Sequence, residues 1–168
     1  MAGTAERQGS RRQRPGRIVV GVDGSASSQE ALRWAVGQGR LAGAVVEALA
    51  AWERPLDYGG YGVALMDVDF AGPARDALDS SIAALGPEAE KDVEIVRRVV
   101  QGHPADVLLK AAQGADLLVL GSRGHGGFAG ALLGSVGQHC VQHAGCPVVI
   151  VRHGEQPADA EARTRPAS

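Results

Sequence analysis

The sequence predicts an α/β fold, built as a single open and mostly parallel sheet of five strands flanked by helices. Short runs of β-branched residues alternate along the chain with segments whose apolar residues recur at helical spacing, and this alternation is typical of parallel sheets. The length of 168 residues allows one domain with short tails. Hydrophobic residues make up 45% of the chain and charged residues 21%, a balance typical of a globular protein with one core.

The first predicted strand and helix stand near the N-terminus. Residues 17–23 form a short β-branched run, Arg-Ile-Val-Val-Gly-Val-Asp, that ends in a turn. Ser27 or Ser28 can cap the helix that follows, and Gly43 is placed to end it. Residues 44–52 are the candidate for the second strand.

Three more strands and three more helical segments follow. A long irregular loop over 53–62 precedes a mostly helical segment, 63–85, that Gly72-Pro73 must break or restart. The remaining elements are a strand over 93–100, a helix over 103–112 with Gly114 at its end, a strand over 116–121, a helix over 134–144 and a strand over 146–152.

Charge is distributed unevenly along the chain. The formal net charge is −2, but residues 1–17 carry +4 and residues 18–153 carry −5. A basic arm could contact nucleic acid or a membrane surface, although a solvated, disordered tail is the favoured interpretation. The acidic folded part and an aromatic content of 4% both argue against a nucleic-acid-binding protein.

Targeting signals and cysteines bear on location. The first ten residues lack the apolar stretch of a secretory signal, and no run of 18 apolar residues occurs. Cys140 and Cys146 are too few for a disulfide framework in a chain of this size. We therefore expect a cytoplasmic protein without a membrane span. Its expected organisation is a disordered basic arm (1–16), one domain (17–153) and a disordered tail (154–168).

The predicted topology also locates a binding site. In open parallel sheets, ligands bind beyond the carboxyl ends of the strands, where the strand order reverses. Asp23 ends the first strand and Gly121 ends the fourth. In flavodoxin-like and related strand orders these two strands are neighbours, so we expect both residues at one site.

The loop after the fourth strand is rich in glycine, and it reads Gly121-Ser-Arg-Gly-His-Gly-Gly-Phe-Ala-Gly-Ala-Leu-Leu-Gly-Ser-Val136. Its backbone N–H groups are little shielded by side chains, and a helix starts at Gly134 or Ser135. Such backbone arrangements and helix N-termini bind anions, phosphate above all. Arg123 contributes a cation and Ser135 a hydroxyl.

Two known phosphate-binding loops fit this stretch poorly. A P-loop needs a lysine directly after a glycine, whereas Lys91 follows Glu90 and Lys110 follows Leu109. The dinucleotide fingerprint belongs to a first βαβ unit and needs an acidic residue about 20 positions downstream. The glycines here follow the fourth strand, and no such acid is present.

The spacing of Gly121, two residues, Gly124, nine residues and Gly134-Ser135 resembles the ATP-binding signature of the universal stress protein family. The flanks are similar too: Ile-Val-Val-Gly-Val-Asp-Gly-Ser near the start, Asp-Leu-Leu-Val-Leu-Gly-Ser-Arg-Gly-His in the middle and Cys-Pro-Val-Val-Ile-Val near the end. Together they span residues 17–153. The resemblance implies a Rossmann-like fold of the adenine nucleotide alpha hydrolase type.

The resemblance also implies a set of cofactor-binding residues: Gly21, Val22, Asp23, Ala51, Leu120, Gly121, Arg123, Gly124, Gly134, Ser135 and Val136. Asp23 matches the acid at the adenosine end, where a carboxylate accepts from ribose hydroxyls. Ala51 matches the position whose main chain holds the adenine, although its strand lacks the His-Val common in the family. The glycines lie beside ribose and phosphates, and residues 134–136 match the triphosphate cradle. The implied cofactor is ATP with Mg²⁺.

Each candidate residue has a structural alternative. Asp23 can be a turn or capping residue, the glycines can serve a sharp turn, and Gly134-Ser135 can be a plain helix start. Whether Arg123 or His125 reaches a phosphate stays open. A zinc site built from His139, Cys140, His143 and Cys146 is not favoured, because neighbouring helical positions point about 100° apart and a cysteine opening a buried strand is an ordinary core residue.

The leading hypothesis is an ATP-binding universal stress protein that acts as a nucleotide-responsive regulator, with an unknown protein partner. No residue stands out as catalytic, so at most slow ATP hydrolysis is expected. The resemblance implies a homodimer, for which the apolar last strand, 148–151, is a suitable edge. The alternatives are an interaction protein that binds no ATP, or AMP or cyclic AMP instead, and a weak ATP hydrolase.

Overall fold

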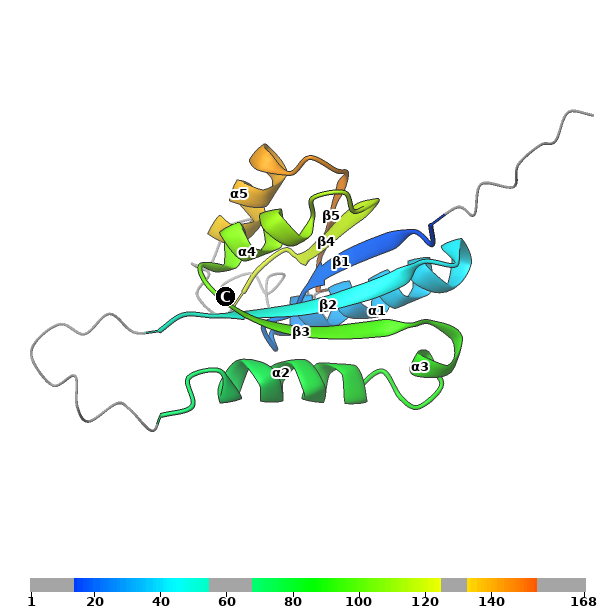
Figure 1. Ribbon diagram of the computed structural model, residues 1–168, viewed down its shortest axis with the longest axis horizontal. Helices are drawn as coiled ribbons and strands as arrows, with labels where there is room; N and C mark the ends of the chain where they lie inside the picture. Colours follow the sequence, from blue (N-terminus) through cyan, green and yellow to red (C-terminus); the bar gives the residue numbers. More distant parts are fainter. Residues whose placement is uncertain (1–13, 55–67, 125–132, 154–168) are drawn as a thin grey trace, which may run out of the picture.

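Five parallel strands form one sheet, in the order β3-β2-β1-β4-β5 (Figure 1). The computed structural model describes residues 14–54, 68–124 and 133–153. The strands are β1 (Arg17–Gly21), β2 (Val45–Trp52), β3 (Ile95–Gln101), β4 (Leu117–Gly121) and β5 (Val148–Val151). The predicted sheet is therefore confirmed, and β1 lies beside β4 as expected.

Helices cover both faces of the sheet. They are α1 (Ala26–Ala42), α2 (Gly72–Ala83), α3 (Ala89–Asp92), α4 (Pro104–Ala111) and α5 (Ser135–His143). The helices α1 and α2 lie on one face, and α4 and α5 lie on the other (Figure 1). The result is a three-layer arrangement with the sheet in the middle.

Each face of the sheet has its own hydrophobic core. Ile18 and Val20 of β1 pack with α1 and α2, whereas Val19, between them, packs with α4 and α5. Successive strand residues point to opposite faces, so one buried strand supplies both cores. All three side chains are at most 4% exposed, which explains why the run is apolar without polar alternation.

The N-cap of α1 differs from the prediction. The N-cap of α1 is Ser25, not Ser27 or Ser28, because the Ser25 hydroxyl accepts from the backbone N–H of Ser28 at 3.2 Å. Gly43 ends α1 in the left-handed region, with φ 62°, as predicted. The helix α2 starts at Gly72 with Pro73 in its first turn, at the pair where a break or restart was predicted.

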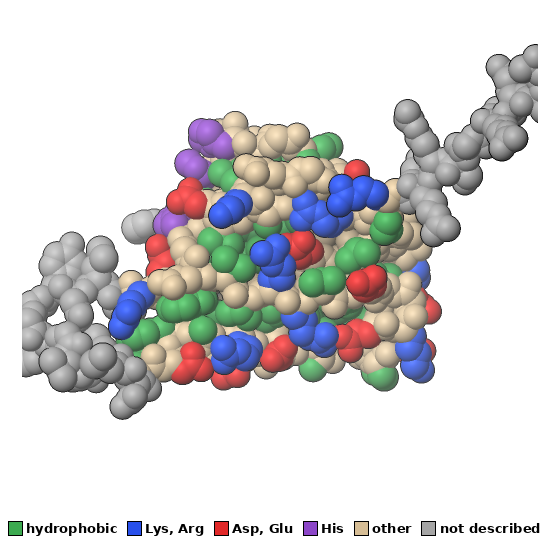
Figure 2. All heavy atoms as spheres, viewed as in Figure 1, with side chains coloured by type: hydrophobic (Ala, Val, Ile, Leu, Met, Phe, Trp, Pro, Cys, Tyr) green, Lys and Arg blue, Asp and Glu red, His purple; other side chains and the backbone are tan. Residues whose placement is uncertain are grey.

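Several sequence-based expectations fall on residues outside those that the structure describes. These are most of the basic arm 1–16, the tail 154–168, much of the predicted loop 53–62 and helix start 63–67, and His125 with the central glycines of the loop. Within the described ranges, no helix is long and apolar enough to cross a membrane. Positive and negative side chains are interspersed on the face of the molecule seen in Figure 2.

Candidate functional site

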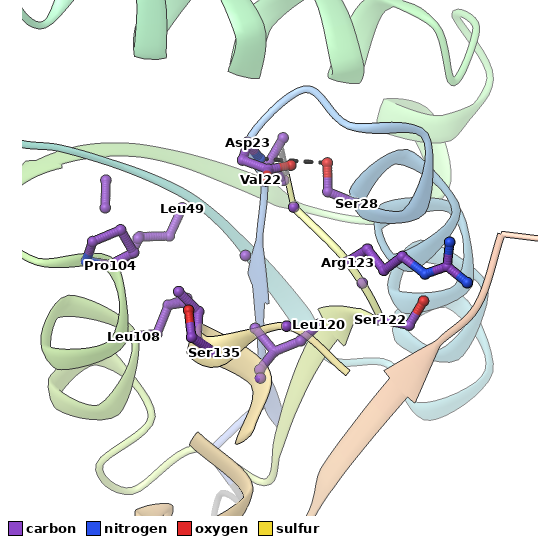
Figure 3. Close-up of a pocket in the computed structure, with 17 residues that line it drawn as sticks. Val22, Asp23, Ser28, Leu49, Pro104, Leu108, Leu120, Ser122, Arg123 and Ser135 are labelled. Carbon is purple, nitrogen blue, oxygen red and sulfur yellow. Dashed lines mark hydrogen bonds between the residues drawn. The ribbon is translucent and has the colours of Figure 1, made fainter. Parts of the chain in front are cut away.

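A cavity of about 270 Å³ opens where β1, β2 and β4 end (Figure 3). It is lined by Gly21, Val22, Asp23, Ser28, Leu49, Ala51, Pro104, Leu108, Leu120, Gly121, Ser122, Arg123, Gly124, Gly134, Ser135, Val136 and Gly137. All eleven residues named from the sequence are among them. The fold thus brings together segments that lie more than 100 positions apart in the chain.

Six of the lining residues were not predicted from the sequence to belong to the site. Ser122 and Gly137 adjoin predicted residues, and Ser28 was noted only as a helix cap. Leu49 stands two positions before Ala51 on the same strand, so strand alternation could have found it. Pro104 and Leu108 come from α4, and no local signal in the sequence places that helix at the cavity.

One side of the cavity is apolar. Leu49 of β2, Leu108 of α4 and Leu120 of β4 contribute buried side chains, with at most 5% of each exposed. Leu49, Leu108 and Pro104 lie together in Figure 3, across the cavity from Arg123. A flat, apolar group would find van der Waals contact here and would lose little hydrogen bonding to water.

Asp23 stands at the polar edge of the cavity, just past the end of β1. Its Oδ1 accepts hydrogen bonds from the Ser25 backbone N–H at 2.9 Å and the Ser25 hydroxyl at 2.6 Å. Its own N–H donates to the Ser28 hydroxyl at 3.4 Å, the bond drawn in Figure 3. Asp23 therefore does shape the turn into α1, yet its side chain is exposed and its Oδ2 lies toward Gly124.

The N-terminus of α5 forms another part of the wall. Gly134 is its N-cap in extended conformation, and the Gln138 N–H donates to Gly134 O at 2.9 Å. By helix geometry the N–H groups of residues 135–137 come before that first helical bond. They lie at the positive end of the helix dipole, where anions are stabilised.

The glycines at the cavity differ in what surrounds them. A Cβ atom on Gly121 would lie 2.7 Å from the backbone of Ser27 and Ser28, and one on Gly21 would lie 3.0 Å from Leu120. At Gly134 the nearest atom of the described residues to such a Cβ would be 3.8 Å away, an ordinary contact distance. Packing against the described residues therefore does not require glycine at 134, and its φ of −70° suits any residue.

Arg123 borders the cavity mainly through its main chain. In Figure 3 its side chain extends away from Leu49 and Leu108, and the residue is exposed. Its backbone N–H and carbonyl contact the Ser27 hydroxyl.

The residues considered for zinc do not form a cluster. His139 and His143 stack with ring centroids 4.3 Å apart on α5. Burial raises the pKa of the Cys140 thiol to about 11 and also raises the pKa of Cys146, so both thiols are poor sources of metal-binding thiolate. Among the residues that the structure describes, no group of three or more His, Cys, Asp or Glu could hold a metal ion.

The fold and the cavity define a Rossmann-like α/β domain of the adenine nucleotide alpha hydrolase type. The chain belongs to the universal stress protein family, whose family model matches residues 15–152. A universal stress protein of Mycolicibacterium smegmatis is 35% identical over 142 residues, which cover 80% of this chain and 45% of the relative. One of Mycobacterium tuberculosis strain H37Rv is 34% identical over 145 residues, covering 80% and 44%. The chain thus spans about half the length of the curated relatives it matches.

Solved structures are similar to the whole fold. A universal stress protein in complex with cAMP is 30% identical, with a TM-score of 0.54, covering 81% of this chain and 95% of that one. The UspA protein of Lactobacillus plantarum is 24% identical, with a TM-score of 0.59, covering 83% and 99%. A universal stress protein of Archaeoglobus fulgidus in complex with dAMP is 22% identical, with a TM-score of 0.56, covering 81% and 97%. The last two likenesses concern the fold alone.

Proposed function

We propose that this chain is an ATP-binding universal stress protein that acts as a nucleotide-responsive regulator. The observation that carries the proposal is that a Cβ atom at Gly134 would make only ordinary contacts, of 3.8 Å or more, with the described residues. Neither those contacts nor its φ of −70° requires glycine, and the residue borders the cavity at the N-terminus of α5. A phosphate group that approaches the backbone closely would explain why this position has glycine.

The proposed binding mode follows the chemistry of the wall. Leu49 and Leu108 pack against the adenine, and the main chain at Ala51 bonds its polar edge. The Asp23 carboxylate accepts from the ribose hydroxyls through Oδ2, which accepts no hydrogen bond from the described residues, whereas Oδ1 is bonded to Ser25. The N–H groups of residues 135–137 at the start of α5 and the Ser135 hydroxyl hold the phosphates. Mg²⁺ would accompany the triphosphate and reduce its charge.

Occupancy is the proposed signal. A bound nucleotide would contact the ends of β1 and β4 together with the N-terminus of α5, three segments that meet at the cavity. Such a ligand stabilises the arrangement that binds it and shifts the population recognised by a protein partner. Turnover is not part of the proposal beyond slow ATP hydrolysis.

Three other functions are worth testing beside this one. The cAMP complex of the 30%-identical relative favours a nucleotide with a single phosphate, AMP or cyclic AMP, as the ligand. An interaction protein that binds no nucleotide would keep the same fold. A weak ATP hydrolase would release phosphate after extensive purification, and Gly124→Ala would abolish that release.

Isothermal titration calorimetry tests the proposal. ATP with Mg²⁺, AMP, cyclic AMP and GTP are titrated into folded protein freed of carried-over nucleotide. We expect binding of ATP that weakens in Asp23→Ala and is lost in Gly134→Asp. Gly134→Ala is the sharpest variant, because its melting temperature should equal that of the wild type while its ATP affinity falls. Absence of heat with ATP would overturn the proposal, and binding of AMP or cyclic AMP alone would replace it.

We also propose a homodimer formed through β5. The strand order leaves β3 and β5 as the two edges. Arg97 and Arg98 stand in the middle of β3, and charges on an edge oppose strand pairing. The edge strand β5 reads Val-Val-Ile-Val and is half-buried throughout. Light scattering after size exclusion should give twice the monomer mass, and a monomer at micromolar concentration would contradict this.

We also propose that the protein is cytoplasmic and that residues 17–153 form one folding unit. Both cysteines are free thiols, which is typical of reducing compartments, and the family match at 15–152 supports the unit. Cell fractionation tests the location, and limited proteolysis followed by mass spectrometry tests the boundaries.

A further inference from the structure

Ser27 joins the first turn of α1 to the start of the loop after β4. Its hydroxyl donates to the Arg123 carbonyl and accepts from the Arg123 N–H at 3.4 Å. The residue is only 5% exposed, and its partner lies 96 positions later in the chain. One buried hydroxyl thus contacts both polar groups of a single main-chain residue.

Close packing at Gly121 restricts movement of Ser27 relative to the end of β4. The backbone of Ser27 and Ser28 lies 2.7 Å from the place where a Cβ on Gly121 would stand. The first turn of α1 is therefore pressed against the end of β4. The Ser25 hydroxyl gives the Arg123 carbonyl a second, longer contact of 3.3 Å.

The main chain held by Ser27 leads to the proposed phosphate end of the cavity. Just before Arg123, the Ser122 carbonyl accepts from the Gly134 N–H at 2.9 Å, and this bond fixes the N-cap of α5. A shift of Arg123 would therefore be passed through the Ser122 carbonyl to the N-terminus of α5, where the proposed phosphate contacts lie.

We propose that Ser27 is a positioning residue that sets the phosphate end of the nucleotide site. It does not line the cavity, so it acts through Arg123 and Ser122 and not by contact with a ligand. The apolar end, at Leu49 and Leu108, is built by other elements. The inference rests on the proposed nucleotide function, and it predicts that Ser27 affects phosphates selectively.

The test compares ATP with adenosine, which shares the base and ribose but has no phosphate. In Ser27→Ala, ATP with Mg²⁺ should bind about fivefold more weakly, the effect of one lost hydrogen bond. Adenosine affinity, measured by NMR titration because that method detects weak binding, should stay within about twofold, since the phosphate contacts are the ones lost. Ser27→Thr keeps the hydroxyl and should restore ATP binding.

Ser81→Ala is the matched control. Ser81 is also a buried helical serine, 2% exposed, and its hydroxyl donates to a backbone carbonyl, that of Ala77, at 2.7 Å. It lies in α2 and does not line the cavity. Its loss should lower the melting temperature about as much as Ser27→Ala does, without changing ATP affinity.

Amide hydrogen exchange without nucleotide tests the contact between Ser27 and Arg123 directly. The Arg123 amide should exchange its hydrogen faster in Ser27→Ala than in the wild type or in Ser81→Ala, because its acceptor is removed. Equal losses for ATP and adenosine, or no loss of ATP binding, would overturn the role of Ser27 while the proposed function stands. A wild-type protein that binds no ATP would instead overturn the proposed function, and this inference with it.

Discussion

The carboxylate of Asp23 occupies the space that a side chain on Gly124 would need. A Cβ built on Gly124 would lie 2.7 Å from Asp23 Oδ2, well inside van der Waals contact. The two residues follow β1 and β4, which are paired in parallel at the centre of the sheet. Glycine at 124 therefore keeps Oδ2 where it borders the cavity.

Gly124→Ala should weaken ATP binding with little effect on stability. The atom in the way ends a short, exposed side chain, so Asp23 can turn aside, and the free energy of unfolding should change by less than about 0.5 kcal/mol. ATP affinity should fall about tenfold, because a hydrogen bond to a charged group is misplaced. Calorimetry measures the binding. In an Asp23→Ala background Gly124→Ala should have no further effect, and additive losses would show that the two residues act separately.

Gly121→Ala should destabilise the fold itself. Its Cβ would meet backbone atoms of Ser27 and Ser28 at 2.7 Å, and neither can move without shifting α1. We expect a loss of about 2 to 3 kcal/mol in the free energy of unfolding, measured by urea denaturation. Gly37→Ala is the control, because no atom of the described residues lies within 4 Å of its Cβ position in α1. That variant should gain up to about 1 kcal/mol, and equal effects of the two would contradict the packing argument.

Glu47→Ala should leave two arginines without their common partner. Glu47 of β2 is 6% exposed and accepts from Arg17 at 2.9 Å and from Arg98 at 2.6 Å. Removing one partner of a buried pair costs about 3 to 5 kcal/mol, and the partial exposure of both arginines should reduce this to about 2 kcal/mol. Glu30→Ala, which removes an exposed pair with Arg33, should cost less than about 0.5 kcal/mol. Chemical denaturation compares the two, and similar losses would refute the burial argument.

Stability should fall at high pH because of Cys140. Burial raises the pKa of its thiol from 9.0 to about 11, so between these values the unfolded chain loses a proton that the folded chain keeps. The free energy of unfolding should decrease there by up to about 1.4 kcal/mol per pH unit. Other groups titrate in the same range, so the measurement is the difference between wild type and Cys140→Ala from pH 8 to 11. A difference that stays constant with pH would count against this assignment.

The parallel sheet and most of the cavity wall could be predicted from the sequence, for a physical reason. Alternation of strand and helix favours parallel pairing, which places the carboxyl ends of the strands at one edge of the sheet, and the expected neighbourhood of the first and fourth strands places the ends of β1 and β4 together. Asp23 and Gly121 could therefore be placed at one site before any contact was known. The family resemblance supplied the remaining positions, Ala51 among them.

What could not be predicted depends on packing between distant segments. Ser25, Ser27 and Ser28 near the start of α1 can each cap a helix by residue type, and only the bond that the Ser25 hydroxyl accepts from the Ser28 N–H shows that Ser25 is the cap. Leu108 reaches the cavity because α4 packs over β1 and β2, and no local sequence pattern predicts this packing. The glycines look alike in sequence, yet a Cβ is excluded at 121 and accommodated at 134.

The cavity has a consequence for the order of events during synthesis. Its wall is complete only when α5 has joined β1, because the lining residues run from Gly21 to Gly137. A chain still emerging from the ribosome can form β1, α1 and β2, but it has no place for the whole ligand until nearly all of its strands exist. A ligand that binds there would stabilise the finished fold by mass action, but it would not stabilise the earlier folding intermediates. The ligand concentration would therefore affect the lifetime of the folded protein and not the first steps of its folding.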